Sequence, residues 1–380
     1  MSEHVEINEE YGDMSSTSEI IVLKHPDCEN LKTNKVKYDE QAPDAVEIDP
    51  NEVKEFEFVD KVTKTQKEES TNEEALVENG AYRNFFYIGE LGRMNEIKPK
   101  YAGAFGYRPD NTIDRIDVGK LTLGAVSLRG IMHQDLAKPR QDALAFSVTD
   151  DRKYLIAAIA DGVSAATLSH IGADFAVSAI LKLINTVLKK NKESLNDIDW
   201  QSIYEDLHAQ FIDRSAKLAK QGLFKVIGKA NPAKYAEVLG TTAEALIIAI
   251  QPDKLGKHDF LRVVFAGDGS GYTLDPEKGW CILSSGKDNS GEIADSSVVP
   301  LPIECEGAPW LFAGHISENQ AVMIATDGIG DLGIGSENDT SVFLQKMLSR
   351  PASSIELLKA FSVLIRYKDD DRTAVIVWVS

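Results

Sequence analysis

Cysteine is scarce in this sequence, and the few residues present form no functional pattern. The 380 residues include three cysteines, Cys28, Cys281 and Cys305, which are far apart and make no Cys-x-x-Cys pair. Their odd number and wide spacing argue against a disulfide framework and against a zinc site built from paired cysteines. Neither a Cys-x5-Arg nor a Gly-x-Ser-x-Gly pattern occurs, so no cysteine or serine nucleophile of these kinds is indicated.

A signal peptide and long apolar runs are missing as well. The N-terminus, Met1-Ser2-Glu3-His4-Val5-Glu6, has neither the basic start nor the hydrophobic run that directs secretion. No apolar stretch approaches the roughly 20 residues that span a bilayer. We therefore expect a soluble, cytoplasmic protein with no membrane partner.

Basic residues are outnumbered, and the excess of acid is uneven. The chain has 41 Lys and Arg against 60 Asp and Glu, a net charge of −19, and residues 1–80 alone hold 22 acidic and 8 basic residues. The rest of the chain is nearly balanced, so it lacks the basic surface of a nucleic-acid-binding protein. Its hydrophobic share of 43% and charged share of 27% are typical of globular proteins.

Composition divides the chain into three parts. Residues 1–80 bury too little apolar surface to offset their chain entropy, which predicts a mostly disordered acidic arm. Two apolar spots, at 20–23 and 56–59, leave open whether the arm only aids solubility or binds a partner. Residues 81–118 are rich in aromatic side chains, which favours packing on the body, with a ligand or partner as the alternative. Residues 119–380 form the expected main domain.

Hydrophobic periodicity in the main domain predicts many strands and two groups of helices. Strands are expected at 121–128, 143–148, 154–160, 241–250, 260–266, 271–274, 280–283, 321–325 and 373–379. Helices are expected at about 167–188, 200–218, 340–348 and 353–366, with loops at 221–231 and 284–315. Because the helices are grouped, the pattern favours an α+β sandwich over a doubly wound sheet.

Short acidic motifs stand at the ends of these apolar runs. They contain Asp142, Asp161, Asp268, Asp327, Asp331 and Asp370. Carboxylates gathered at the ends of buried strands repel one another unless cations lie among them. Acidic ligands without histidine or cysteine favour Mg²⁺ or Mn²⁺ over zinc. Two such ions about 4 Å apart, bridged by a water, could supply a hydroxide nucleophile and hold a phosphoryl oxygen.

Taken in order, the motifs resemble the PP2C (PPM-type) family of metal-dependent Ser/Thr protein phosphatases, over about residues 121–379. The matching stretches are Gln141-Asp142, Asp161-Gly162-Val163-Ser164-Ala165, Gly240-Thr241-Thr242-Ala243, Gly267-Asp268, Thr326-Asp327-Gly328-Ile329-Gly330-Asp331 and Asp370-Asp371-Arg372-Thr373. Two further stretches, 130–133 and 139–142, are more similar to a bacterial branch than to the animal enzymes.

The resemblance implies an αββα sandwich, in which two antiparallel sheets are flanked by helices and metals lie in a cleft at one edge. It implies that Asp161 bridges two core ions and that the Gly162 carbonyl ligates one of them. Asp327 and Asp370 would hold the second ion, and Asp142 would act partly through bound waters. The resemblance also implies a looser third site, formed by Asp268 and Asp331 with Asp327.

Two positions depart from the family pattern. Ala137 stands where many members carry an arginine that grips the phosphate, and Lys138, Arg140 or Arg129 could substitute for it. Val163 stands where many animal members carry a histidine that protonates the leaving group. A metal-bound water, or one of two histidines near the motifs, His133 and His170, could serve instead. His133 could equally be a structural residue.

The leading hypothesis is an enzyme that hydrolyses phosphoserine or phosphothreonine on proteins without forming a phosphoenzyme. Its partners would be a phosphorylated protein substrate and a counterpart Ser/Thr kinase. The alternative is a catalytically weak or inactive PP2C-like scaffold or regulatory binding protein, which the two departures favour and the complete acidic set opposes. A third hypothesis places the function in the acidic arm, with the body as its carrier.

Overall fold

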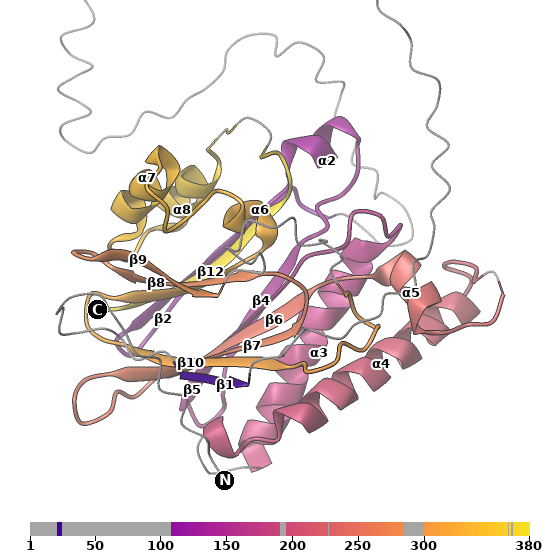
Figure 1. Cartoon of the computed structure of the whole chain (residues 1–380), viewed down its shortest axis with the longest axis horizontal. Helices are drawn as coiled ribbons and strands as arrows, with labels where there is room; N and C mark the ends of the chain where they lie inside the picture. Colours follow the sequence, from indigo (N-terminus) through magenta and orange to yellow (C-terminus); the bar gives the residue numbers. More distant parts are fainter. Residues whose placement is uncertain are drawn as a thin grey trace, which may run out of the picture. The chain divides into compact units, whose positions relative to one another are not determined.

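Two six-stranded antiparallel sheets stack face to face in the computed structural model, and helices cover their outer faces (Figure 1). The structure describes residues 21–24, 108–190, 195–226, 228–284, 299–363, 365 and 368–380. All of them belong to one compact unit. The predicted sandwich of two antiparallel sheets flanked by helices is confirmed. The expected arm at 1–80 lies outside the described residues except for 21–24, and so does 81–107 of the aromatic segment.

The first sheet holds six strands in the order β1-β10-β7-β6-β5-β4. Their bounds are β1 Ile21–Lys24, β10 Trp310–Ile316, β7 His258–Ala266, β6 Ala243–Ala249, β5 Tyr154–Ala160 and β4 Ala143–Val148. Side chains alternate between the faces, as a strand requires. On β6, Ala245 and Ile247 belong to the core under the helices, whereas Leu246 and Ile248 belong to the core between the sheets.

The second sheet has the order β2-β3-β12-β11-β8-β9. Its strands are β2 Asn111–Val118, β3 Leu121–Leu128, β12 Arg372–Val379, β11 Ala321–Ala325, β8 Ser270–Asp275 and β9 Gly279–Ser284. On β12, Ile376 and Trp378 face the helices, and Val375 and Val377 face the first sheet. The body therefore has three apolar layers, one between the sheets and one under each group of helices.

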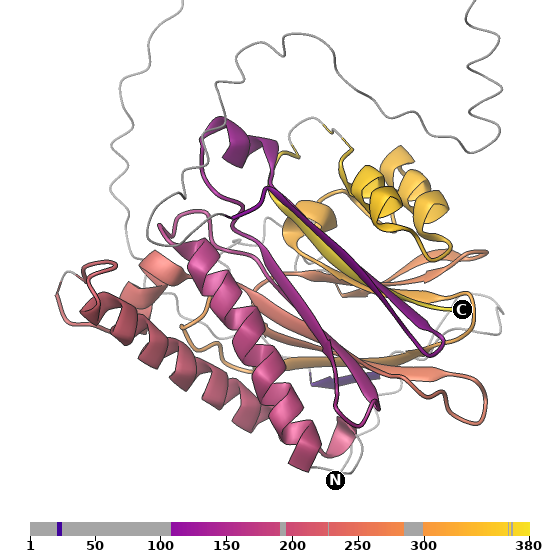
Figure 2. The same cartoon turned by 180° about the vertical axis from the view of Figure 1, so that it is seen from behind.

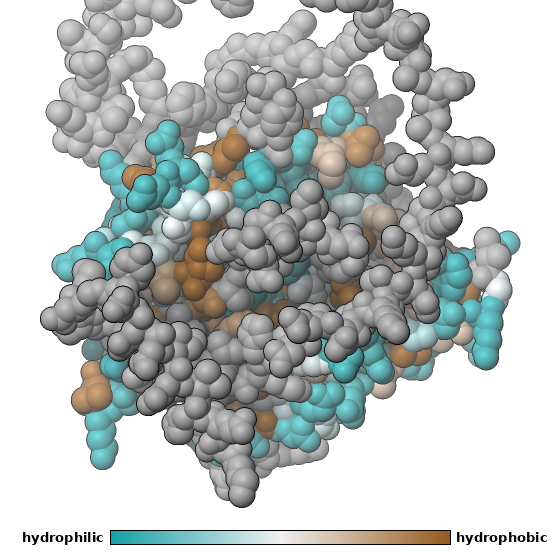
Figure 3. Space-filling model, in the orientation of Figure 1, coloured by the Kyte–Doolittle hydropathy of each residue, from teal (hydrophilic) through white to brown (hydrophobic). Residues whose placement is uncertain are grey.

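Helices of one group cover the first sheet, and helices of another cover the second. The helices are α2 Ile131–Asp135, α3 Ser169–Lys190, η1 Leu195–Asp197, α4 Trp200–Lys220, α5 Pro232–Leu239, α6 Asp327–Gly330, α7 Asp339–Leu348 and α8 Ser354–Phe361. Figure 2 shows α3 and α4 side by side on the first sheet, while α6, α7 and α8 lie on the second. Figure 3 shows mainly hydrophilic side chains over the outer side of α7 and α8, although Val342 and Ile355 on these helices are exposed.

One helix has the length and composition of a membrane span. The segment Ser169–Lys189 of α3 is apolar enough by these criteria, although the sequence suggested no run of that length. Its residues Ala173, Ala176 and Ile180 are fully buried in the core that α3 forms with the first sheet. Its apolar character is therefore accounted for by packing inside the body.

The elements differ from the sequence predictions in several places. Strand β1 lies in the arm expected to be mostly disordered, β2 lies within the segment assigned to 81–118, and β10 lies in the predicted loop 284–315. The helices α2, η1, α5 and α6 were not predicted. Helix α8 ends at Phe361, short of the predicted 366. The other predicted strands and helices are confirmed within a few residues.

Candidate functional site

The acidic motifs meet at one edge of the sandwich because each lies at the end of a strand. Asp142 directly precedes β4 and Asp161 directly follows β5, both in the first sheet. Asp327 opens α6 just after β11, and Asp370 lies just before β12, both in the second sheet. The site thus draws on both sheets, and the buried strands fix where each carboxylate begins.

Asp142 is the most enclosed carboxylate of the set, at 1% exposure. Its Oδ2 accepts a hydrogen bond from the Thr326 hydroxyl at 2.9 Å, whereas its buried Oδ1 has no hydrogen-bond partner among the described residues. Burial is the main cause that raises the pKa of Asp142 to about 8, and the charge of Asp371 adds to it. A buried oxygen without a partner is costly, so this side chain is arranged for a cation or a proton.

Asp161 is held through its backbone by the Thr-Thr motif of the next strand region. Its N–H donates to the Thr242 hydroxyl at 2.8 Å, and the Thr242 N–H donates back to the Asp161 carbonyl at 2.7 Å. Burial, followed by the charges of Asp142 and Asp327, raises the pKa of Asp161 well above its usual value. The Asp142 and Asp327 carboxylates therefore lie close enough to Asp161 to oppose its ionisation.

Glycines let the acidic motifs approach at backbone distance. A Cβ at Gly162 would lie 2.9 Å from the Gln141 carbonyl oxygen and 2.8 Å from Cβ of Ser169. A Cβ at Gly328 would lie 1.9 Å from the Asp371 carbonyl oxygen. Each glycine that follows an aspartate thus packs against the chain of another motif, and no larger residue would fit there.

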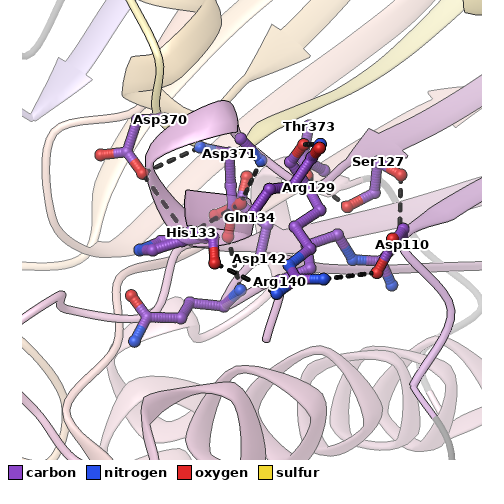
Figure 4. Close-up of polar contacts among 12 residues, drawn as sticks. Asp110, Ser127, Arg129, His133, Gln134, Arg140, Asp142, Asp370, Asp371 and Thr373 are labelled. Carbon is purple, nitrogen blue, oxygen red and sulfur yellow. Dashed lines mark hydrogen bonds and ion pairs between the residues drawn. The ribbon is translucent and has the colours of Figure 1, made fainter. Parts of the chain in front are cut away.

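Asp371 organises the first and last acidic motifs from inside. Its side chain is 2% exposed and accepts hydrogen bonds from the N–H groups of Gly130, at 2.6 Å, and Gln141, at 2.5 Å. His133 Nδ1 lies 2.9 Å from Asp371 Oδ1 and 3.9 Å from Asp370 Oδ1 (Figure 4). These three residues each place one ligand atom within 4.8 Å of the others, a group that could hold a metal ion.

His133 is buried, at 1% exposure, beside these acids. Its Nδ1 forms an ion pair with Asp371 when the ring is protonated. Burial alone would lower the pKa of His133, but Asp371, Asp370 and Asp142 together raise it. The structure thus places His133 at the acidic site, as a charge partner to it.

His170, the second histidine considered above, is also buried, near the start of α3. Burial, with the nearby charge of Arg108, lowers its pKa to about 4. It is therefore neutral at ordinary pH, which suits packing better than proton donation.

The two remaining predicted ligands lie on the outer side of the set. Asp268 stands in the turn between β7 and β8, and its charge contributes to the raised pKa of Glu244. Asp331 ends α6, where its N–H donates to the Asp327 carbonyl at 2.7 Å. Its Oδ2 lies 3.2 Å from the Lys368 ammonium. The main charges that raise the pKa of Asp161 are those of Asp142, Asp327 and Asp370, and neither Asp268 nor Asp331 is among them.

Two of the three cations predicted to contact phosphate belong to the frame of the site. Buried Arg129 donates to Asp110 at 3.0 Å and to the His133 carbonyl at 3.1 Å. Buried Arg140 donates to the Thr112 hydroxyl at 2.8 Å and to the Ser127 carbonyl at 2.9 Å, and burial lowers its pKa to about 10 (Figure 4).

Lys138, the third predicted cation, is only half-buried and follows α2. Its side chain makes no ion pair with a residue that the structure describes. It is therefore better placed than the two arginines to meet a substrate.

Several residues at the site were missed by sequence reasoning. Arg108 donates to the Asp142 carbonyl and pairs with Asp174, while the Thr326 hydroxyl binds Asp142 across 184 residues of sequence. Contacts of this kind leave no local pattern. Thr326 alone had a signal, because it opens the Thr-Asp-Gly motif.

The residues present fit divalent cations. The partnerless Oδ1 of Asp142 and the mutually opposed carboxylates of Asp161 and Asp327 are accounted for by positive charge placed among them. The donors are mainly carboxylate oxygens, which suit Mg²⁺ or Mn²⁺. Aspartates 142, 161, 327 and 370 would hold the core ions.

Comparison with known proteins finds a matching family model and several similar solved structures. A family model for "Protein phosphatase 2C" matches residues 129–361. No curated protein matches the chain by sequence. Among solved structures, the chain is similar to the serine/threonine phosphatase Stp1 from Staphylococcus aureus, with 12% identity, 70% of this chain and 98% of that chain covered, and a TM-score of 0.48.

Two further solved structures are similar to a comparable degree. The S. agalactiae serine/threonine phosphatase shows 14% identity, with 68% and 100% coverage and a TM-score of 0.44. RsbX in complex with magnesium shows 14% identity, with 71% and 100% coverage and a TM-score of 0.42. The family match spans more than half of the 380 residues and includes the motifs around Asp142, Asp161 and Asp327, while the motif around Asp370 follows it. The chain belongs to the protein phosphatase 2C family.

Proposed function

We propose that the protein hydrolyses phosphoserine and phosphothreonine on proteins, with divalent ions bound among Asp142, Asp161, Asp327 and Asp370. The observation that supports this most directly is the buried, partnerless Oδ1 of Asp142 beside Asp161, whose pKa is raised by burial and by its acidic neighbours. A scaffold has no physical need to gather such mutually repelling groups, whereas a metal-dependent hydrolase does.

When bound, two ions would supply a bridging hydroxide that attacks the phosphorus directly, without a phosphoenzyme. The chain's own contribution is to position the ligands. Asp161 and the Gly162 carbonyl would both contribute ligands to the ions, with Asp161 shared between them. Thr242 holds the Asp161 backbone in place for this role. Asp142 would be oriented by Thr326. The half-buried Lys138 is the best placed of the three predicted cations to contact the phosphate, and the buried His133 would adjust the charge near Asp370.

The remaining assignments form part of the same proposal. The cofactor would be Mn²⁺ or Mg²⁺, with two core ions, and Asp268, Asp331 and Asp327 are the residues that a third ion would need. The partners would be a phosphorylated protein and the Ser/Thr kinase that modifies it, in the cytoplasm. Residues 1–80 would form an acidic arm that could bind a partner, and the aromatic-rich segment 81–118 would pack on the phosphatase domain at 119–380.

The test is hydrolysis of p-nitrophenyl phosphate and of a phosphothreonine peptide in Mn²⁺, Mg²⁺ or EDTA. We expect metal-dependent release of phosphate by the wild-type protein and a loss of at least about 100-fold in Asp161→Asn, because a bridging carboxylate has no substitute. Asp150→Asn is the matched control, since that carboxylate lies in an exposed turn. Equal activity in EDTA, or a fully active Asp161→Asn, would contradict the proposal.

A second candidate is a scaffold that binds metal or a partner but hydrolyses little. The observation in its favour is that Arg129 and Arg140 are bound to carbonyl and hydroxyl groups of the frame, away from a substrate position. Calorimetry separates the two candidates. Metal binding with no hydrolysis under any of these conditions would establish the scaffold and exclude the phosphatase.

A further inference from the structure

A lysine ammonium lies against the outer carboxylate of the site. Lys368 Nζ is 3.2 Å from Asp331 Oδ2, and the two side chains are 36% and 32% exposed. We propose that Lys368 is a built-in cation that takes the place of a third metal ion beside Asp331, so that the protein works with two ions. This inference rests on the proposed metal centre.

The backbone of Lys368 is fixed, so the position of its ammonium is set by the fold. Its N–H donates to the Ile365 carbonyl at 3.1 Å, and its carbonyl accepts from Arg372 at 2.7 Å. The guanidinium of Arg372 is buried and also donates to the carbonyls of Phe361 and Val363. Arg372 therefore binds the carbonyls of Phe361, Val363 and Lys368 together and holds Lys368 close to α6.

The backbone of Asp331, the other member of the ion pair, is also held by a hydrogen bond. It ends the single turn of α6 that Asp327 begins, and its N–H donates to the Asp327 carbonyl. A divalent ion that bound Asp331 would stand next to the Lys368 ammonium, and two cations at that separation repel each other. The outer site can fill only when the partly exposed lysine side chain moves into solvent.

The other cations of the motif region do not compete for this role. Arg129, Arg140 and Arg372 are each at most 7% exposed. Arg140 and Arg372 donate to carbonyl or hydroxyl groups of the frame, and Arg129 donates to the His133 carbonyl and to Asp110, outside the acidic motifs. Their positive charge is committed to holding the chain together. Lys368 differs because its ammonium pairs with Asp331, a carboxylate that the family resemblance assigns to a metal ion.

The experiment counts Mn²⁺ ions bound to the full-length protein, by electron paramagnetic resonance and calorimetry, without any substrate. We expect two tight ions in the wild type. In Lys368→Met we expect a third ion to bind about fivefold more tightly or better, the usual scale for releasing a partly exposed ion pair. Lys368→Arg keeps the charge and should behave as the wild type, and Lys368→Met with Asp331→Asn should return to two ions.

Lys189→Met is the matched control, because that lysine also pairs with an aspartate, Asp150, on the exposed surface away from the site. Circular dichroism verifies that each variant is folded, and Lys368→Gln provides a second neutral side chain. Three ions of equal affinity in the wild type, or identical isotherms for the wild type and both neutral variants, would overturn the inference and leave the two-ion phosphatase intact. Absence of any Mn²⁺ binding would overturn both.

Discussion

Asp142 carries a large part of the electrostatic cost of the site without bound cations, and shares that cost with Asp161. Burial and the charges of Asp371 and Asp370 raise its pKa from 3.8 to about 8. The folded protein therefore binds a proton that the unfolded chain releases at much lower pH. The stability this proton contributes is fully present below the unfolded pKa and is lost as the pH rises towards the folded value.

We predict that the EDTA-treated protein loses stability between about pH 4 and pH 8, by up to about 1.4 kcal/mol per pH unit for one such group. Urea unfolding at several pH values measures this slope. Asp142→Asn should flatten it, because the amide does not titrate, and saturating Mn²⁺ should reverse the loss at high pH. A slope that Asp142→Asn leaves unchanged would show that other groups cause it.

At the scale of elements, a buried ion pair connects the two sheets beneath the Asp268 turn. Arg262 Nε on β7 donates a hydrogen bond to Glu244 Oε2 on β6 at 2.6 Å. The same guanidinium donates to the Gly269 carbonyl beside β8 at 2.6 Å. Arg262 also lies 5.4 Å from the centre of the Phe312 ring. A Cβ at Gly269 would lie 2.4 Å from Glu244 Oε1, so the turn that contains Asp268 and Gly269 packs directly against the Glu244–Arg262 ion pair.

We predict that Glu244→Gln costs about 3 kcal/mol of unfolding free energy, because it removes the carboxylate counter-charge from the fully buried guanidinium of Arg262. Glu244→Leu combined with Arg262→Met should cost less than either single change, since apolar pairs can replace buried ions. Denaturant unfolding of the two single variants and the double variant measures the coupling. Strictly additive costs would mean that the pair does not act as a unit.

Elements with a strong local pattern were predictable, and elements that depend on a partner were not. Strands β5, β11 and β12 are continuous apolar runs, which identify buried strands without further information. Strand β10 contains Gly314 and His315 and is recognisable only by its pairing with β7. Helix α5 did carry a local signal that was overlooked, an Asn231 cap followed by Pro232.

At the scale of the whole molecule, the ordered motifs identified the family and predicted where the core aspartates gather. This was possible because strand ends in a sandwich meet at one edge, so motifs that follow or precede strands in the sequence lie near one another in the fold. The charges that balance those aspartates could not be predicted in the same way. Asp371 reaches Gly130 across 241 residues and Lys368 reaches Asp331 across 37, and only the folded chain brings such pairs together.

The net charge of −19 gives the last prediction, because a phosphorylated substrate is itself an anion. Residues 40–80 contain 13 Asp and Glu, and replacing them with Asn and Gln keeps the chain length while removing that charge. At saturating Mn²⁺ and low salt, we expect kcat/KM for an acidic phosphopeptide to rise about two- to threefold and that for a basic phosphopeptide to fall, since long-range fields steer charged ligands.

Steady-state hydrolysis of the two peptides measures the effect, and about 0.5 M salt should abolish it, because the Debye length then falls to a few ångströms. The basic peptide is the internal control, since a general gain in activity would raise both rates. Equal gains for both peptides that persist in salt would point to direct inhibition by the acidic segment. No change for either peptide would show that its charge does not reach the substrate.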